Sequence, residues 1–260
     1  MDWLNPVAGF GVGVMVGMTG VGGGSLMTPI LVLLFGVAPA AAVGTDLWFA
    51  AITKSAGGLV HHKRGSVDWQ VFRRLCLGSL PASVVTLVWL HQSGIGQMKQ
   101  GFIVSALGVV LLLTAVAMLM RKRLLALGQS YRTNDPDRFK GVQPVLTVVA
   151  GAILGFLVTL TSVGGGALGT VMLLFLYPFR MKPTTLVGTD IVHAIPLTIV
   201  AGIGHLVMGN VNLGLLGGLL LGSIPGIVLG SLLATRAPEG LLRGSIATVL
   251  ALVAGKLLLA

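Results

Sequence analysis

Hydrophobic residues fill this chain in long, uninterrupted runs that are separated by short polar connections. Several runs approach the roughly 20 residues that an α-helix needs to cross a bilayer, and they lack the alternating, roughly ten-residue segments of a membrane-spanning barrel. The pattern therefore predicts an all-α, polytopic membrane protein with about 8 to 10 membrane segments in a single transmembrane domain, residues 1–260. The apolar segments are residues 4–36, 43–60, 74–91, 101–120, 143–177, 186–206, 213–234 and 241–259.

Two of these segments, 4–36 and 143–177, are too long for one crossing at about 1.5 Å per residue and too short for two. Each contains three consecutive glycines, in "TGVGGGSLMTP" from Thr19 and in "TSVGGGALGT" from Thr161. Because glycine weakens a helix interior, we expect each segment to fold as a hairpin of two partial helices with unwound backbone at the bend. Such backbone is tolerated at membrane depth only where it is buried in protein or lines a wet cavity.

The two halves of the chain resemble each other. "VGTD" at residues 43–46 recurs at 187–190, and "GSLP" at residues 78–81 recurs as "GSIP" at 222–225. These ordered matches indicate an internal duplication. The predicted units are repeat one at residues 4–120, a cytoplasmic connection at 121–142 and repeat two at 143–259.

Composition narrows the class of protein. Hydrophobic residues make up 55% of the 260 residues and charged residues only 9%, whereas about a quarter of the residues in a soluble domain are charged. The formal net charge of +10 comes mostly from short loops, which argues against a soluble nucleic-acid-binding face.

The basic residues also predict how the chain is oriented, because cytoplasmic loops carry an excess of lysine and arginine. Groups at residues 63–74, 121–140, 180–182 and 236–243 hold 14 of the 17 basic residues. If all of these loops lie on the cytoplasmic side, the loop that follows the "VGTD" segment is cytoplasmic in repeat one. The equivalent loop of repeat two then lies on the opposite side of the membrane. The repeats are therefore predicted to have inverted topologies, and inverted repeats with broken helices are typical of secondary transporters.

The twin glycine stretches and the motifs after them carry a family resemblance. They read "GVGGGSLMTPIL" and "SVGGGALGTVML", each is followed by "VGTD", and "GSLP" or "GSIP" comes later. At these residues, and over nearly its whole length, the chain resembles the TauE/SafE sulfite exporter family, also described as sulfonate uptake permeases. The resemblance implies transport of sulfite, organosulfonates or similar sulfur-containing anions, coupled to an ion gradient, in a cell membrane such as the bacterial inner membrane. The copies differ at Pro29, which is matched by Val171.

The glycine bends form the predicted anion site. A helix that begins after a bend presents unpaired N–H groups and the positive end of its dipole, and glycine lets an oxyanion approach the backbone closely. Close helix packing is the better explanation for a single glycine, but the paired triplets favour a site. The candidate substrate-binding residues are Gly22, Gly23, Gly24, Ser25, Thr28, Thr161, Ser162, Gly164, Gly165, Gly166, Thr170 and Lys54.

Two acids, Asp46 and Asp190, lie within apolar segments at equivalent places in the repeats. A charge in hydrocarbon costs at least about 2.5 to 3.5 kcal/mol, so each is expected to have a partner or a task. Because "GTD" opens both segments, the aspartates are either N-terminal helix caps or coupling sites for a proton or cation, and the two roles can coexist. His193, one turn after Asp190, either relays a proton or only packs. Lys54 either selects an anion, pairs with Asp46, or extends its stem towards the membrane interface.

These features favour a secondary transporter of small sulfur-containing anions that works by alternating access. Two alternatives stay open: a non-transporting assembly factor or partner subunit, and an intramembrane hydrolase or transferase in which Asp190 and His193 act as acid and base. We expect no cofactor, no metal site and no nucleic-acid partner. The expected partners are the anion, the lipid bilayer and a proton or sodium ion, and a homodimer is left open.

Overall fold

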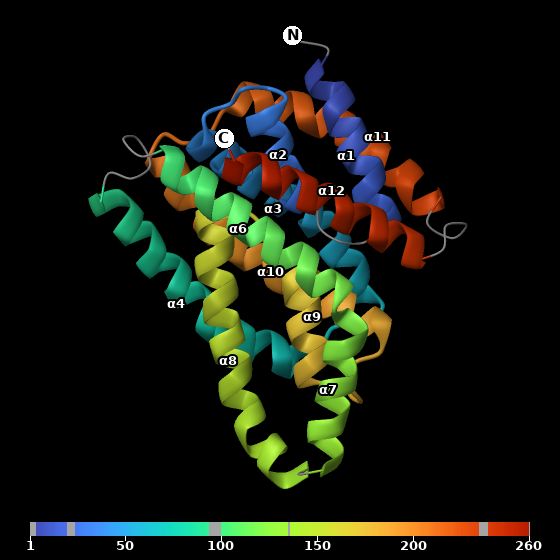
Figure 1. Ribbon diagram of the computed structural model, residues 1–260. Helices are drawn as coiled ribbons and strands as arrows, with labels where there is room; N and C mark the ends of the chain where they lie inside the picture. Colours follow the sequence, from blue (N-terminus) through green and yellow to red (C-terminus); the bar gives the residue numbers. More distant parts are fainter. Residues whose placement is uncertain (1–3, 20–23, 94–99, 135, 234–238, 260) are drawn as a thin grey trace.

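The computed structural model describes residues 4–19, 24–93, 100–134, 136–233 and 239–259, and these residues form a bundle of α-helices without any strand (Figure 1). The all-α prediction is therefore confirmed for this part of the chain. The helices are α1 (Leu4–Thr19), α2 (Gly24–Leu33), α3 (Pro39–Lys63), α4 (Trp69–Ser93), α6 (Gln100–Leu119), α7 (Arg121–Asn134), α8 (Pro136–Thr161), α9 (Ala167–Leu176), α10 (Pro183–Val207), α11 (Leu213–Leu233) and α12 (Glu239–Leu259).

Within the described residues, five helices are long and apolar enough to cross a membrane, namely α4, α6, α8, α10 and α11. Helix α3 matches α10 in length, at 25 residues each, but it carries Asp46, Lys54 and a basic last turn. These helices agree with a multi-pass membrane protein. The total number of membrane segments and the repeat boundaries stay predictions.

The second glycine stretch breaks the helix where the sequence predicts. Helix α8 ends at Thr161, α9 begins at Ala167, and the chain then turns back along α8. At the far end of this hairpin, the Tyr177 hydroxyl lies 2.8 Å from Thr147 Oγ1 of α8. The expectation of two partial helices is wrong for α8, because its 26 residues suffice to cross a bilayer. Helix α9, with ten residues, reaches about half that far.

The first glycine stretch is described only in part. Helix α1 ends at Thr19 and the ten-residue α2 begins at Gly24, and residues 20–23 between them lie outside the described residues. The ends of this hairpin also come together, because Asn5 at the start of α1 and Phe35 after α2 line one cavity. Both segments are thus divided into a longer helix and a ten-residue helix, but α8 and α9 pack on each other more extensively than α1 and α2 do.

The polar connection predicted at residues 121–142 is itself helical. It contains α7 and the first turns of α8, which converge at one end of the molecule beyond the other helices (Figure 1). Leucine, alanine, arginine and lysine dominate its first half, and these residues have high helix propensity. The connection between the halves is therefore built mainly from helix in the described residues.

The most extensive packing joins helices from different halves of the chain. Helix α1 packs on α11, and α8, its equivalent, packs on α4, the equivalent of α11. Small residues make these contacts close: a Cβ atom at Gly9 of α1 would overlap the Leu219 carbonyl, and one at Gly151 of α8 would overlap the Leu75 carbonyl. Helices α3 and α10 also pack on each other, as do α6 and α12. Equivalent segments therefore make equivalent contacts.

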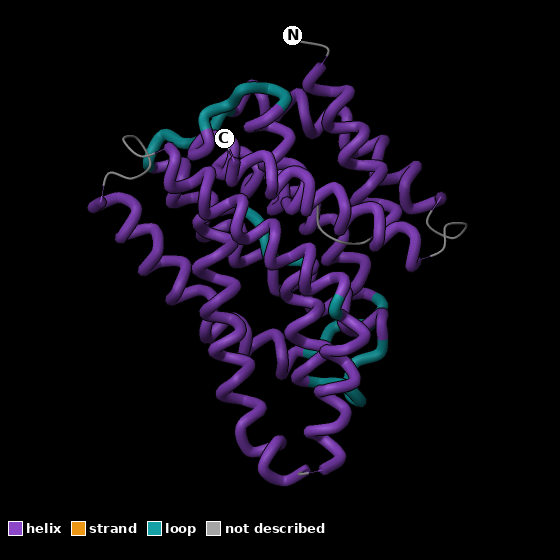
Figure 2. The backbone as a smooth tube through the Cα atoms, viewed as in Figure 1, coloured by secondary structure: helices purple, strands orange, loops and turns teal. Residues whose placement is uncertain are grey.

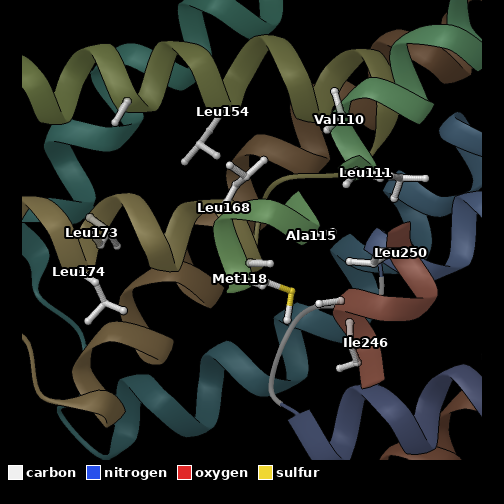
Figure 3. Packing of buried hydrophobic residues seen from close by; sticks show 14 of the residues in the cluster. Val110, Leu111, Ala115, Met118, Leu154, Leu168, Leu173, Leu174, Ile246 and Leu250 are labelled. Carbon is white, nitrogen blue, oxygen red and sulfur yellow. The ribbon is translucent and has the colours of Figure 1, made fainter. Parts of the chain in front are cut away.

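A second core lies beside these helix pairs. Figure 3 shows Val110, Leu111, Ala115 and Met118 of α6 facing Ile246 and Leu250 of α12, with Leu154 of α8 and Leu168 of α9 nearby. All of these side chains are buried. Helix α6 thus packs against both helices of the α8–α9 hairpin as well as against α12.

The close approach of α1 and α11 gives a testable expectation. Gly9→Ala should lower the free energy of unfolding of the purified protein by about 1–3 kcal/mol, because the new methyl group would overlap the backbone of α11, which cannot shift locally. Gly11→Ala, two residues away, is the matched control, because nothing lies within 4 Å of its Cβ position. Equal melting temperatures of the two variants in detergent would contradict the packing described here.

Candidate functional site

The two buried aspartates occupy the same position in equivalent helices. Asp46 is the eighth residue of α3 and Asp190 the eighth residue of α10, and both are almost fully buried. The interpretation as N-terminal caps is therefore wrong. Each helix starts about two turns earlier, at Pro39 or Pro183, where proline is well suited to the first helical position. Both carboxylates are thus placed inside the bundle.

The Asp46 carboxylate is held by the first hairpin. Thr28 of α2 donates a 2.5 Å hydrogen bond from Oγ1 to Asp46 Oδ2. The other oxygen, Oδ1, is buried without a hydrogen-bond partner among the described residues. Ser162, in the second glycine bend, lies near this carboxylate, and its buried hydroxyl is also without a partner there. Asp46 therefore sits between the two hairpins, bonded to the first through Oδ2 and with unused hydrogen-bonding capacity at Oδ1.

Lys54 connects α3 to the second glycine bend. Its side chain is only 8% exposed, and Nζ donates a 2.7 Å hydrogen bond to the carbonyl oxygen of Gly165. The alternative in which Lys54 extends to the membrane interface is therefore wrong. Lys54 interacts electrostatically with both Asp46 and Asp190, but forms no direct ion pair with either of these two residues. The ammonium group thus lies within electrostatic reach of carboxylates on two helices, α3 and α10.

Asp190 lies against the second short helix. A Cβ atom at Gly169 of α9 would overlap Asp190 Oδ1, so the carboxylate is in close contact with the α9 backbone. His193, one turn later, has Nε2 at 2.9 Å from Ser79 Oγ of α4, and its Nδ1 is buried without a partner in the described part of the chain. No hydrogen bond joins Asp190 to His193, so the structure does not form the predicted relay directly.

Carbonyl groups of the second glycine bend accept backbone hydrogen bonds from the first turn of α9. Gly164 adopts a φ of +120°, and its carbonyl accepts a bond from the Gly169 amide, while Gly166 accepts one from the Thr170 amide. Ser162 has a φ of +59°, which is uncommon for a residue with a side chain and indicates local strain. The first amides of α9 have no intrahelical acceptor, as at any helix start.

The predicted anion-binding residues are only partly brought together. Four of these residues lie around Asp46 and Lys54, namely Thr28, Ser162, Gly165 and Lys54 itself. The Thr161 and Thr170 hydroxyls instead donate to carbonyls of their own helices, those of Leu157 and Ala167. Gly22 and Gly23 lie outside the described residues, as does the side chain of Ser25; Gly24 is the first residue of α2.

The cluster of Asp46, Lys54, Asp190 and His193, which we call the central cluster, is closed to solvent. Two described cavities, of about 520 Å³ and 360 Å³, lie at other places in the bundle and are not lined by these four residues. Figure 2 shows loops gathered at two ends of the molecule and a short loop in its interior. The central cluster is therefore occluded in this conformation.

Two threonines next to the aspartates have structural roles that the sequence interpretation missed. Thr45 Oγ1 accepts the amide of Asn212 at the start of α11, and Thr189 Oγ1 accepts the amide of Asp68 at the start of α4. Ser79, the partner of His193, was also missed. All three residues belong to the repeated "VGTD" and "GSLP" motifs, so the repetition itself was the signal that could have identified them.

Comparison with known proteins places this arrangement in a family. The sequence model for the sulfite exporter TauE/SafE family matches residues 6–257. The chain belongs to this family. Within TauE/SafE, it is 38% identical over 210 residues to the probable membrane transporter protein YjnA of Bacillus subtilis (strain 168), covering 78% of this chain and 79% of that protein. It is 27% identical over 208 residues to the probable membrane transporter protein MJ0441 of Methanocaldococcus jannaschii, covering 76% and 69% of the two chains. No solved structure gives a significant match.

Membership in TauE/SafE decides between the classes of function that the sequence left open. The family and the matching relatives are membrane transporters, so this protein is a multi-pass membrane transporter and not an enzyme. The hydrolase hypothesis is therefore wrong, and so is the hypothesis of a non-transporting subunit. His193 hydrogen-bonds to Ser79 rather than to Asp190, which agrees with this outcome.

Proposed function

We propose that this protein is a secondary transporter of a small sulfur-containing anion, such as sulfite or an organosulfonate, and that a proton or sodium gradient drives it. The observation that carries the proposal is the bond from Lys54 of α3 to Gly165 of the second glycine bend, between two buried carboxylates. This contact brings the charged residues of one half onto the helix break of the other. Broken helices of this kind hold substrates and coupling ions in secondary transporters.

The charges of the central cluster support coupling to a cation. With both aspartates ionised, Lys54 protonated and His193 neutral, the central cluster has a net charge of −1, and one bound cation would neutralise it. At about 4 Å and an effective dielectric constant of about 20, two unit charges interact by about 4 kcal/mol. An entering anion would be repelled unless a proton or sodium ion first neutralised a carboxylate. We therefore propose that the cation binds before the anion.

The two hairpins support alternating access. Thr28 of the first short helix, α2, bonds to Asp46 of α3. Lys54 and Asp190 contact the second hairpin. A shift of either hairpin therefore alters the central cluster. In the proposed cycle, inverted repeats move against each other and expose the cluster first to one side and then to the other. We propose that an occluded cluster, as described here, is the intermediate between these two states.

Flux measurements test the proposal. Purified protein in proteoliposomes should accumulate radiolabelled sulfite or an organosulfonate when a pH or sodium gradient is imposed, and accumulation should stop when an ionophore removes that gradient. Sulfate, phosphate and chloride complete the panel, and protein-free liposomes give the background. If no sulfur-containing anion moves or binds, the proposed substrate class is wrong. If flux occurs but ignores both gradients, the coupling is wrong.

A further inference from the structure

A basic cavity lies outside the central cluster, where the α7–α8 hairpin meets the segment between α9 and α10. Its volume is about 360 Å³, and its lining includes Arg132 of α7, Lys140 of α8 and Arg180 of the α9–α10 segment. The other lining residues are Gln143, Tyr177, Pro178 and Phe179. We call this cavity the basic pocket. Three different segments thus each contribute one cationic side chain to it.

The charges of the basic pocket are only partly compensated within the described part of the protein. Arg180 pairs with Asp68, with Nε at 2.7 Å from Oδ2, and also donates to Gln70 Oε1. Arg132 donates to the Pro136 carbonyl, which carries no charge, and Lys140 makes no hydrogen bond or ion pair with any described residue. Three cations and one carboxylate leave an excess of two positive charges around the pocket.

The equivalent end of the other half has no such charge. The cavity there has a volume of about 520 Å³ and is lined by Asn5, Asn212 and apolar or glycine residues, without a charged side chain among its described lining residues. Phe35 and Val37 of that cavity correspond in the repeats to Tyr177 and Phe179 of the basic pocket. Arg132 and Lys140 lie in the connection at residues 121–142, which has no counterpart in the other half, so the two cavities share only the segment that follows each short helix.

The donors suit a tetrahedral oxyanion. Arginine offers five N–H donors and lysine three, and most of those on Arg132 and Lys140 are free of partners among the described residues. The excess of two positive charges matches an inorganic phosphate dianion and more than balances the single negative charge of a phosphodiester head group. The loops of this end carry the basic groups that predict a cytoplasmic location, and basic pockets on that side of membrane proteins bind phosphate-bearing head groups. The pocket also has apolar walls at Pro178 and Phe179.

We infer that the basic pocket binds a phosphate-type oxyanion, supplied either by an anionic phospholipid head group or by a free inorganic anion. The bound group would bridge α7, α8 and the α9–α10 segment. Helix α7 already packs tightly on the end of α9, where a Cβ atom at Gly128 would overlap the Phe175 carbonyl. An oxyanion in the pocket therefore fixes the outer end of the short helix whose inner end forms the second glycine bend. This site is independent of the proposed transport substrate.

Binding is tested with two probes on the intact protein in nanodiscs. Native mass spectrometry measures retained phosphatidylglycerol against a phosphatidylcholine background, and equilibrium dialysis measures labelled inorganic phosphate in phosphatidylcholine nanodiscs. Retention of the lipid identifies a head-group site, and saturable phosphate binding identifies a free-anion site. In either case, the Arg132→Gln/Lys140→Gln double variant should bind the probe at least about tenfold more weakly.

Two further variants, one outside the pocket and one that preserves both charges, keep the test specific. Lys122→Gln removes one exposed cation from the same helix, α7, outside the pocket lining, and should bind like the wild type. Arg132→Lys/Lys140→Arg keeps both charges and should retain most of the binding. The inference is overturned if neither probe binds the wild type, if Lys122→Gln loses as much binding as the double variant, or if the charge-preserving variant loses binding completely.

Discussion

Asp46→Asn and Asp190→Asn are each expected to reduce gradient-driven anion accumulation by about 100-fold, corresponding to roughly 2.7 kcal/mol. Asparagine has nearly the size of aspartate but cannot take up a proton or balance a cation. In Asp46→Asn, the side-chain carbonyl of the introduced amide would still accept the hydrogen bond from Thr28, so the fold around it should persist. The loss should therefore appear in transport and not in thermal stability.

Proteoliposome flux with an imposed gradient measures this effect, and counterflow without a gradient provides the comparison. Asp137→Asn is the control, because Asp137 is an exposed acid in the first turn of α8, far along that helix from the second glycine bend. A coupling role predicts that counterflow survives better than accumulation. If both aspartate variants keep full gradient-dependent flux, the assignment of the coupling site fails, although the protein remains a transporter.

Lys54→Gln is expected to have the second large effect. It removes the cation next to two buried carboxylates and should destabilise the protein by roughly 3–5 kcal/mol, the usual cost of leaving a buried charge uncompensated. Combining Lys54→Gln with Asp190→Asn should recover most of this stability, because one of the two negative charges is removed as well. The double variant should nevertheless stay about 100-fold below wild type in flux, since both coupling and anion attraction are lost.

Thermal unfolding in detergent and proteoliposome flux, measured on the same preparations, check this expectation. Lys256→Gln is the matched control, because Lys256 is an exposed lysine in the last turn of α12. Full transport by Lys54→Gln would remove Lys54 from the site. Failure of Asp190→Asn to restore stability would show that Lys54 acts mainly through its hydrogen bond to Gly165 rather than through charge.

The sequence predicted the features that depend on local backbone preferences. Three consecutive glycines between Ser162 and Ala167 disfavour a helix in any context, so the break between α8 and α9 follows from composition alone. The family membership followed in the same way, because the repeated motifs are contiguous in the chain. The position of the aspartates was misjudged for a local reason: Pro39 and Pro183 start their helices before "GTD", and a proline at the first helical position outweighs a capping residue further on.

Contacts across the chain could not be predicted in this way. Lys54 and Gly165 are 111 residues apart, and nothing local to either indicates that the ammonium group would turn inward rather than extend to an interface. The same holds for Ser79, which meets His193 only because α4 packs beside α10. The sequence thus identified the chemical groups of the site but not their pairing, which depends on how the two hairpins are placed in three dimensions.

The exchange of partners between the halves also bears on how this chain arose. Because α1 packs mainly on α11 and α8 packs mainly on α4, a polypeptide of half this length would leave two of its helices without these partners. Such an ancestor would cover these helices by pairing with a second copy of itself. Gene fusion would then have made permanent, and free to diverge, an assembly that two separate chains first had to build by meeting in the bilayer.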